Sequence, residues 1–260
     1  MKITVLGCWA PYPRAGGACS GYLIRGGGQN ILLEAGNGSL SRMMEFLDFR
    51  CLDAVIISHL HPDHYLDLFP LRHAIEGARR DGSLAEPLKL ILPSMPVQAF
   101  QVLEGYKKAF ETTPVEELPL EQSLSGTPVR RLDLGKLSIC FVPTKHSLPG
   151  YAISFTGAGK LVFSGDTAWT EELVEITRGA DLFLSEASGQ DQDAAYLGEF
   201  HLTARQAGEI ARRAGVRKLL LTHFWPEYDP DLLVQQALES YDGPVLAARE
   251  GETYRVMPGM

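Results

Sequence analysis

Six consecutive residues limit what this chain of 260 residues can fold into more than any other feature. They read His59-Leu60-His61-Pro62-Asp63-His64 and directly follow Ala54–Ser58, an apolar run whose length predicts a strand buried on both faces. Residues two apart in an extended segment point the same way, so His59 and His61 can bind one ion together. The run therefore predicts a metal site at the end of a buried strand.

Asp63 and His64 come where the chain turns, and we expect a helix from there through Leu66, Leu68, Leu71 and Ile75. The two side chains can bind a second ion close to the first. Imidazole and carboxylate together suit zinc, manganese or iron, and they exclude a calcium site made of oxygen ligands alone. The alternative is a surface loop that happens to be rich in histidine.

Three further side chains of metal-binding types stand at the ends of later expected strands. His146 follows Leu137–Val142, Asp166 follows Leu161–Ser164, and His223 follows Lys218–Thr222. A rigid sheet can hold such ligands in a fixed geometry. Each has an ordinary explanation on its own, since a lone histidine is more often structural and Gly-Asp is a common turn.

The HxHxDH run and the three side chains after it, in this order, resemble the metallo-β-lactamase superfamily. The resemblance implies an α/β protein built as an αββα four-layer sandwich, with two mixed β-sheets packed face to face and helices outside. It also implies a dinuclear centre: one ion on His59, His61 and His146, a second on Asp63, His64 and His223, and Asp166 bridging both. Zinc is the expected ion and manganese the alternative. A hydroxide bridging two such ions is the expected nucleophile.

Two further segments resemble the tRNase Z-like branch of this superfamily. Glu186 stands in Ser185-Glu186-Ala187, where the branch has His-Glu-Ala, and His201 stands in Phe200-His201-Leu202-Thr203-Ala204, where it has His-Ser-Thr-Ala. The resemblance implies that Glu186 orients His201 and that His201 protonates the leaving oxygen as general acid. Glu186 and His201 are therefore predicted to be catalytic residues, and Asp63 is the third residue predicted to be catalytic. The alternatives are that Glu186 is only a carboxylate at the end of a strand and that His201 caps a helix or lies on the surface.

Two departures from that branch argue against tRNA as the substrate. The first loop reads Pro13-Arg14-Ala15-Gly16-Gly17-Ala18, without the lysine, arginine and asparagine of the tRNA nucleases. Only nineteen residues, 147 to 165, separate His146 from Asp166, too few for a tRNA-clamping arm. A net charge of −8 also differs from the basic excess of nucleic-acid-binding surfaces.

The predicted function is a metal-dependent hydrolase of small cyclic or linear phosphodiesters. A tRNA 3′-end endonuclease and a thioester, lactone or β-lactam hydrolase stay open as alternatives, because one fold serves several substrates. A binding or redox module is less favoured, since His61 is intact where flavodiiron-type sites carry glutamate. The expected partner is a small-molecule substrate, with tRNA and a membrane not expected and a homodimer left open.

The rest of the chain predicts alternating strands and helices in one domain, residues 1–260. Ser39 is the expected N-cap of a helix through Met43, Phe46 and Leu47, and Val97–Phe110 is an expected helix. Thr203-Ala204-Arg205-Gln206 has the form of a capping box before a helix that Gly215 ends. The other expected elements are strands at Lys2–Leu6, Tyr22–Arg25, Asn30–Glu34, Leu88–Leu92, Tyr151–Phe155 and Leu182–Ser185, and a last helix opened by Asp229-Pro230.

Composition and a few single residues complete the expectations. No run of about 18 apolar residues and no secretory signal is present, which favours the cytoplasm. The four cysteines are far apart without CxxC spacing and are expected to be reduced thiols. Glu34 is expected to brace the histidine-rich loop. Trp9 and Tyr12 could stack a flat substrate group or simply pack their loop, and His73 is expected to be structural.

Overall fold

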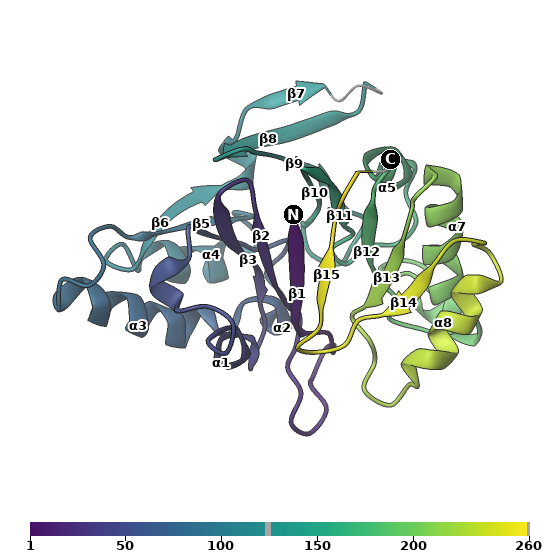
Figure 1. The fold of residues 1–260 in the computed structure, drawn as a ribbon, viewed down its shortest axis with the longest axis horizontal. Coiled ribbons are helices and arrows are strands. Elements are labelled where there is room, and N and C mark those ends of the chain that lie inside the picture. Colours follow the sequence, from purple (N-terminus) through teal and green to yellow (C-terminus); the bar gives the residue numbers. More distant parts are fainter. Residues whose placement is uncertain (123–125, 259–260) are drawn as a thin grey trace.

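Two β-sheets lie against each other with helices on their outer faces (Figure 1). The computed structural model describes residues 1–122 and 126–258. Helices α1 (Ser39–Met43) and α3 (Leu68–Arg80) flank the sheet that contains the N-terminus, and α7 (Ala204–Ala214) and α8 (Pro230–Leu238) flank the other. The predicted four-layer sandwich is therefore confirmed.

The first sheet has seven strands in the order β15-β1-β2-β3-β4-β5-β6. Its strands from β15 to β3 pair antiparallel, and those from β3 to β6 pair parallel. The bounds are β1 (Lys2–Gly7), β2 (Gly21–Gly26), β3 (Gln29–Ala35), β4 (Ala54–Ile56), β5 (Leu88–Leu92), β6 (Phe110–Pro114) and β15 (Thr253–Arg255).

The second sheet has eight strands in the order β14-β13-β12-β11-β10-β9-β8-β7. It is antiparallel from β7 to β11 and parallel from β11 to β14, so both sheets are mixed, as expected. The bounds are β7 (Leu120–Gln122), β8 (Pro128–Leu134), β9 (Leu137–Pro143), β10 (Tyr151–Gly157), β11 (Gly159–Phe163), β12 (Leu182–Glu186), β13 (Leu219–Thr222) and β14 (Val245–Ala247).

The core follows from the period of two along each strand. In β2, Tyr22 and Ile24 belong to the hydrophobic cluster shared by the two sheets, whereas Leu23 belongs to the cluster under the helices. The Tyr22 ring lies 5.6 Å from the Phe163 ring of the other sheet, and its hydroxyl lies 2.6 Å from the Thr222 Oγ1. These contacts fix the two sheets against each other, and with them the strand ends that carry the site.

Three helix boundaries differ from the sequence expectations, and each follows from a contact that is remote in sequence. The first is α1, whose N-cap is Gly38 and not Ser39. The Asp67 carboxylate accepts the Leu40 N–H at 2.8 Å and so supplies the cap from 27 residues away. The helix ends at Met43, and Phe46 and Leu47 lie in the turns that follow.

The helix expected from His64 to Ile75 is divided into α2 (Pro62–Tyr65) and α3. The break lies at Asp67, whose backbone N–H donates to the Ala35 carbonyl at the end of β3 at 2.8 Å. A backbone N–H used in this way cannot continue the hydrogen-bond ladder of α2.

The helix expected over Val97–Phe110 is α4 (Val97–Glu104), followed by Gly105. Phe110 instead begins β6 and pairs with Leu88 of β5. Strands β6, β7, β8, β14 and β15 were not expected from the sequence. The capping box of α7 is confirmed, with Gly215 left-handed at φ 63° behind it, and Pro230 is the first residue of α8.

The shorter elements complete the chain. They are α5 (Glu171–Thr177), α6 (Ala194–Leu197) and the 3₁₀ helices η1 (Phe49–Cys51), η2 (Val115–Glu117) and η3 (Asp191–Asp193). Within residues 1–122 and 126–258, every helix is too short or too polar to cross a lipid bilayer.

Candidate metal centre

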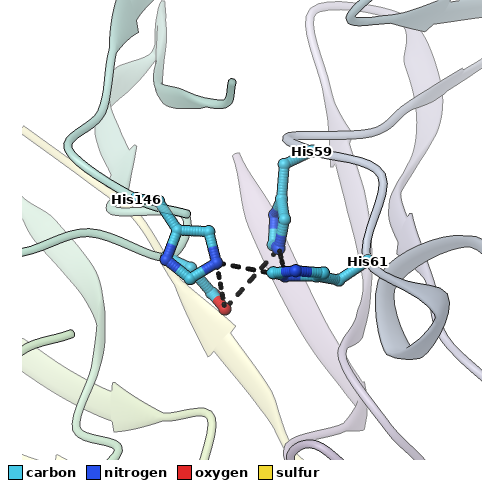
Figure 2. Close-up of side chains that lie close together, drawn as sticks. His59, His61 and His146 are labelled. Carbon is cyan, nitrogen blue, oxygen red and sulfur yellow. Dashed lines mark hydrogen bonds and ion pairs between the residues drawn. The ribbon is translucent and has the colours of Figure 1, made fainter. Parts of the chain in front are cut away.

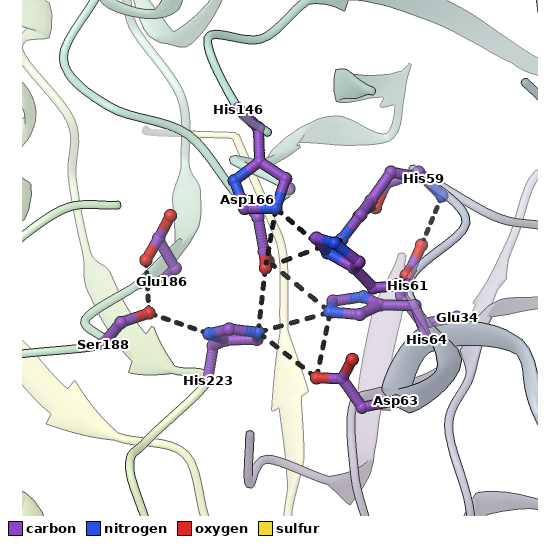
Figure 3. A network of polar contacts seen from close by, with 12 residues as sticks. Glu34, His59, His61, Asp63, His64, His146, Asp166, Glu186, Ser188 and His223 are labelled. Atoms are coloured by element: carbon purple, nitrogen blue, oxygen red, sulfur yellow. Dashed lines mark hydrogen bonds and ion pairs between the residues drawn. The ribbon is translucent and has the colours of Figure 1, made fainter. Parts of the chain in front are cut away.

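The seven predicted ligands converge where the ends of β4, β9, β11 and β13 meet (Figure 3). His59 follows β4 and forms a β-bridge with Gly150, which links the first sheet to the second. Asp166 follows β11, and His223 follows β13 in a left-handed backbone conformation at φ 59°. Side chains far apart in the sequence are therefore held by two rigid sheets.

The first set of converging atoms belongs to His59, His61 and His146 (Figure 2). The His61 Nδ1 lies 3.0 Å from the His59 Nε2 and 3.0 Å from the His146 Nε2. Two nitrogens bound to one tetrahedral zinc ion lie about 3.3 Å apart, given Zn–N bonds of about 2.0–2.1 Å. The three imidazoles are thus spaced as ligands of one ion.

The second set consists of Asp63, His64 and His223. The His64 Nε2 lies 3.2 Å from the His223 Nε2 and 3.5 Å from the Asp63 Oδ2. Asp166 faces both sets, because its Oδ2 lies 3.1 Å from the His223 Nε2 and 3.6 Å from the His59 Nε2. Among these side chains, Asp166 is therefore the one placed to bridge an ion in the first set and an ion in the second.

Two carboxylate oxygens in this cluster lack any hydrogen-bond partner. They are the Asp63 Oδ2 and the Asp166 Oδ1, on residues that are only 7% and 4% exposed. A buried carboxylate oxygen without a partner is costly, and a cation at the centre of the cluster would satisfy it. The His/Asp cluster can therefore hold metal ions, and its donor set fits divalent transition metals.

Glu34 braces the histidine-rich loop as expected. Its fully buried carboxylate accepts the Ser58 N–H at 2.6 Å and lies 2.5 Å from the His64 Nδ1. The residue adopts a left-handed backbone conformation at φ 59°, which is uncommon outside glycine. One carboxylate oxygen thus holds the backbone of Ser58 after β4, and the other holds the ring of His64.

The outer nitrogens of other ligands are fixed in the same way. The His146 Nδ1 donates to the Phe200 carbonyl at 2.9 Å, and the His223 Nδ1 lies 2.8 Å from the Ser188 Oγ. An imidazole that donates from Nδ1 keeps the lone pair on Nε2, which is the atom that faces the cluster.

Burial and charge set the protonation of the ligands. Burial lowers the pKa of His59, His61 and His146, so these rings are neutral at neutral pH, as metal ligands must be. Burial would also lower the pKa of His64, but the carboxylates of Asp166, Asp63 and Glu34 raise it to about 10, so an ion bound by the His64 Nε2 would have to displace a proton from that ring. For Asp166 the balance is opposite: burial raises its pKa, and the surrounding histidines hold it well below the usual value.

Glu186 and His201 lie together beside the ligand cluster. The Glu186 Oε1 accepts the Thr167 N–H at 2.6 Å, and its Oε2 lies 3.1 Å from the His201 Nδ1. Burial would lower the pKa of His201, but the Glu186 carboxylate raises it to about 9. The side chain is 24% exposed, and its Nδ1 lies 4.0 Å from the Asp166 Oδ2, so the imidazole lies at the edge of the ligand cluster.

A cavity of about 710 Å³ opens over the cluster. Its floor includes His61, Asp63 and Asp166, and no lysine or arginine lines it in the part of the chain that the structure describes. Aromatic and apolar side chains form much of its wall: Tyr196, Leu197, Phe200, Trp225 and Tyr228. Its volume is that of a small-molecule site.

Trp9 packs its loop and does not line the cavity. Its buried ring has the Arg14 guanidinium over it at 4.2 Å and meets the Phe224 ring edge-on at 5.9 Å. Tyr12 lies edge-on to Trp225 at 5.7 Å and stands one residue away from Pro11 in the cavity wall. The packing interpretation therefore holds for Trp9.

Sequence reasoning missed Ser188 and Arg14. Arg14 donates from Nε to the Pro226 carbonyl at 2.6 Å and from Nη2 to the Tyr228 carbonyl at 2.7 Å. It thus holds the loop after His223 that forms one wall of the cavity. No spacing rule links residue 14 to this loop, so the contact could not be predicted from the sequence. His73 lies exposed on α3 beside Arg72 and outside the ligand clusters of the described residues.

Arg14→Ala is expected to loosen this wall without touching the ligands. Two charge-assisted hydrogen bonds are lost, so the KM for a small substrate should rise about 5- to 50-fold while kcat changes little. Steady-state kinetics would measure both, with Arg80→Ala at the exposed end of α3 as the control. A fall in kcat at unchanged KM would contradict this role.

Residues 29–224 match the family described as the β-lactamase superfamily domain. The chain is 31% identical over 254 residues to the Bacillus subtilis protein named probable metallo-hydrolase YhfI, covering 96% of this chain and 98% of that one. The crystal structure of the B. subtilis YhfI, described as a metallo-β-lactamase fold protein, matches with a TM-score of 0.88 over 97% of this chain and 98% of that one, at 30% identity. The ribonuclease Z of Archaeoglobus fulgidus is 26% identical over 95% of each chain.

The chain therefore belongs to the β-lactamase superfamily. Within it, the fold and the His/Asp cluster define a metallo-hydrolase of the metallo-β-lactamase type.

Proposed function

We propose that the chain is a phosphodiesterase that uses two divalent metal ions, zinc in the first place and manganese as the alternative. Its ligands are His59, His61 and His146 for one ion, Asp63, His64 and His223 for the other, and Asp166 for both. Two ions held side by side would lower the pKa of a water between them and polarise the phosphoryl oxygens. The unpartnered oxygens of Asp63 and Asp166 support this assignment.

The observation that carries the phosphodiester assignment is the Glu186–His201 pair beside the ligands. The His201 Nδ1 faces the Glu186 carboxylate, which leaves the other ring nitrogen available to the cavity that His201 lines. There the imidazolium can donate a proton to the departing alkoxide oxygen, which is a poor leaving group without one. A thiolate departs without a proton, so the pair favours P–O cleavage over thioester hydrolysis.

Asp63 has a second role in this proposal. It lines the cavity as well as facing the second ligand set, so its carboxylate can accept the proton that the attacking water loses. Asp63 lies in α2 and His201 precedes α7, so the two proton transfers are assigned to separate residues on separate elements. One group serves the attacking water and the other serves the leaving oxygen.

The walls of the cavity favour a small substrate with one negative charge. Asp63, Asp166 and Asp193 line it, and no lysine or arginine does so among the described residues. A polyanion would need lysine or arginine partners beyond the metal ions. A phosphodiester monoanion needs none, and the rings of Phe200 and Trp225 can pack against its organic groups.

A tRNA 3′-end endonuclease is the second candidate, because a ribonuclease Z is among the relatives. Strands β10 and β11 occupy the chain between His146 and Asp166 and leave no segment for a tRNA-clamping arm. The net charge of −8 adds a long-range repulsion of polyanions. We therefore rank this function below hydrolysis of small phosphodiesters.

The proposal is tested with the purified chain loaded with zinc or manganese, and with metal content measured. We expect turnover of methyl p-nitrophenyl phosphate, a diester, to exceed that of p-nitrophenyl phosphate, a dianionic monoester, and both to stop after chelation. Precursor tRNA and a thioester serve as the comparison substrates. Turnover of the thioester or of the tRNA without turnover of the diester would refute the proposal.

A further inference from the structure

Ser188 stands between the two functional parts of the site (Figure 3). It follows β12 by two residues and is half-buried. Its hydroxyl donates to the Glu186 Oε2 and lies 2.8 Å from the Nδ1 of His223 and 3.3 Å from the Nδ1 of His201. One hydroxyl thus contacts a proposed metal ligand and both members of the proposed acid pair.

The donors and acceptors around Ser188 allow one consistent arrangement. The Glu186 carboxylate can only accept, and its Oε1 already receives the Thr167 N–H. The Ser188 O–H therefore points to the Glu186 Oε2, and the Ser188 oxygen keeps its lone pairs for a donor. The nearest donor is the Nδ1–H of His223, which leaves the Nε2 lone pair of that ring facing Asp166 at 3.1 Å.

The same carboxylate oxygen also receives the Nδ1–H of His201 at 3.1 Å. The orientation of His201 therefore depends on where Ser188 holds the Glu186 carboxylate. A hydrogen-bonded path runs from His223 through Ser188 and Glu186 to His201, with Glu186 fully buried. Alanine at position 188 would leave the His223 Nδ1–H without its acceptor and allow the carboxylate to turn.

We propose that Ser188 is a positioning residue that couples the metal ligand His223 to the acid pair Glu186–His201. It fixes the ring of His223 for metal binding and the ring of His201 for proton donation with one hydroxyl. The inference rests on the proposed function for its His201 part, whereas its His223 part requires only that the cluster binds metal.

The test compares Ser188→Ala with Ser188→Thr, which keeps the hydroxyl, and with Ser138→Ala at the start of β9, away from the site. Metal affinity is measured by competition with a chelator. The acid function is measured as the dependence of kcat/KM on the pKa of the leaving phenol in a series of methyl aryl phosphates. A purely structural defect would slow all these esters equally and leave that dependence unchanged.

In Ser188→Ala we expect zinc affinity to fall about 10- to 100-fold and turnover of esters with poor leaving groups to fall by a similar factor. Esters with good leaving groups should be affected much less, and Ser188→Thr should restore both properties to within about threefold of wild type. In the His201→Ala background, adding Ser188→Ala should still weaken zinc binding but should not steepen the leaving-group dependence further.

Three results would overturn the inference: wild-type zinc affinity in Ser188→Ala, an unchanged leaving-group dependence, or a steeper dependence in the double variant than in His201→Ala. If the wild-type chain hydrolyses none of these esters, the proposed function fails. The zinc measurement then still decides the coupling to His223, so the two failures are distinguishable.

Discussion

Asp166→Ala is expected to abolish phosphodiester turnover, with a loss of at least about 10³-fold, and to reduce the bound metal below one ion per chain. The reason is that Asp166 is the one carboxylate that faces both ligand sets, with its Oδ2 at 3.1 Å from the His223 Nε2 and 3.6 Å from the His59 Nε2. Removing it separates two ions that share a ligand and leaves their charges less neutralised. Metal analysis and steady-state kinetics on methyl p-nitrophenyl phosphate measure both effects.

Asp166→Asn separates the charge of the carboxylate from its volume. The amide fills the same space and cannot bridge two cations as an anion does, so its activity should resemble that of Asp166→Ala while its packing is kept. Asp133→Ala, at an exposed position of β8, is the control for the loss of one negative charge elsewhere. Two bound ions and near-normal turnover in Asp166→Ala would show that Asp166 does not bridge them.

The parts of the site that could be predicted from the sequence are those in which the positions of the functional side chains depend on neighbouring residues in one strand or helix. His59 and His61 are two apart after a buried strand, so their common direction follows from the backbone alone. His146, Asp166 and His223 each end a strand, and the structure brings all of them to one edge. The capping box of α7 is likewise a contact within four residues. The resemblance to a known family then supplied the grouping of the ligands and the Glu186–His201 pair.

The parts that could not be predicted depend on contacts between distant segments. Asp67 caps α1 and interrupts the ladder between α2 and α3 through partners at Leu40 and Ala35. Arg14 donates to backbone carbonyls more than 200 residues away, and no hydrophobic period or motif spacing predicts such a contact. Ser188 contacts His223, 35 residues further along the chain, only because the fold pairs β12 with β13. The residue type determines which hydrogen bonds a side chain can donate or accept, whereas the tertiary fold determines which partners it has.

His201→Ala is expected to lower turnover of a dialkyl phosphate about 10²- to 10⁴-fold and to change turnover of a p-nitrophenyl diester far less. The Glu186 carboxylate raises the pKa of His201 to about 9, so the imidazole carries its proton at neutral pH and can give it to an alkoxide. A p-nitrophenolate is already stable as an anion and needs no such donor. The two substrates therefore separate proton donation from every other function of the site.

Glu186→Gln should show the same selectivity in weaker form, because the amide keeps a hydrogen-bond partner for His201 but removes the charge that stabilises the imidazolium. His73→Ala on the exposed face of α3 is the matched histidine control and should behave as wild type on both substrates. Equal losses on the two diesters in His201→Ala would mean that the residue binds substrate or supports the metal ligands. The acid would then have to be sought among the other polar groups that line the cavity, such as Ser188, Asp193 and Tyr228.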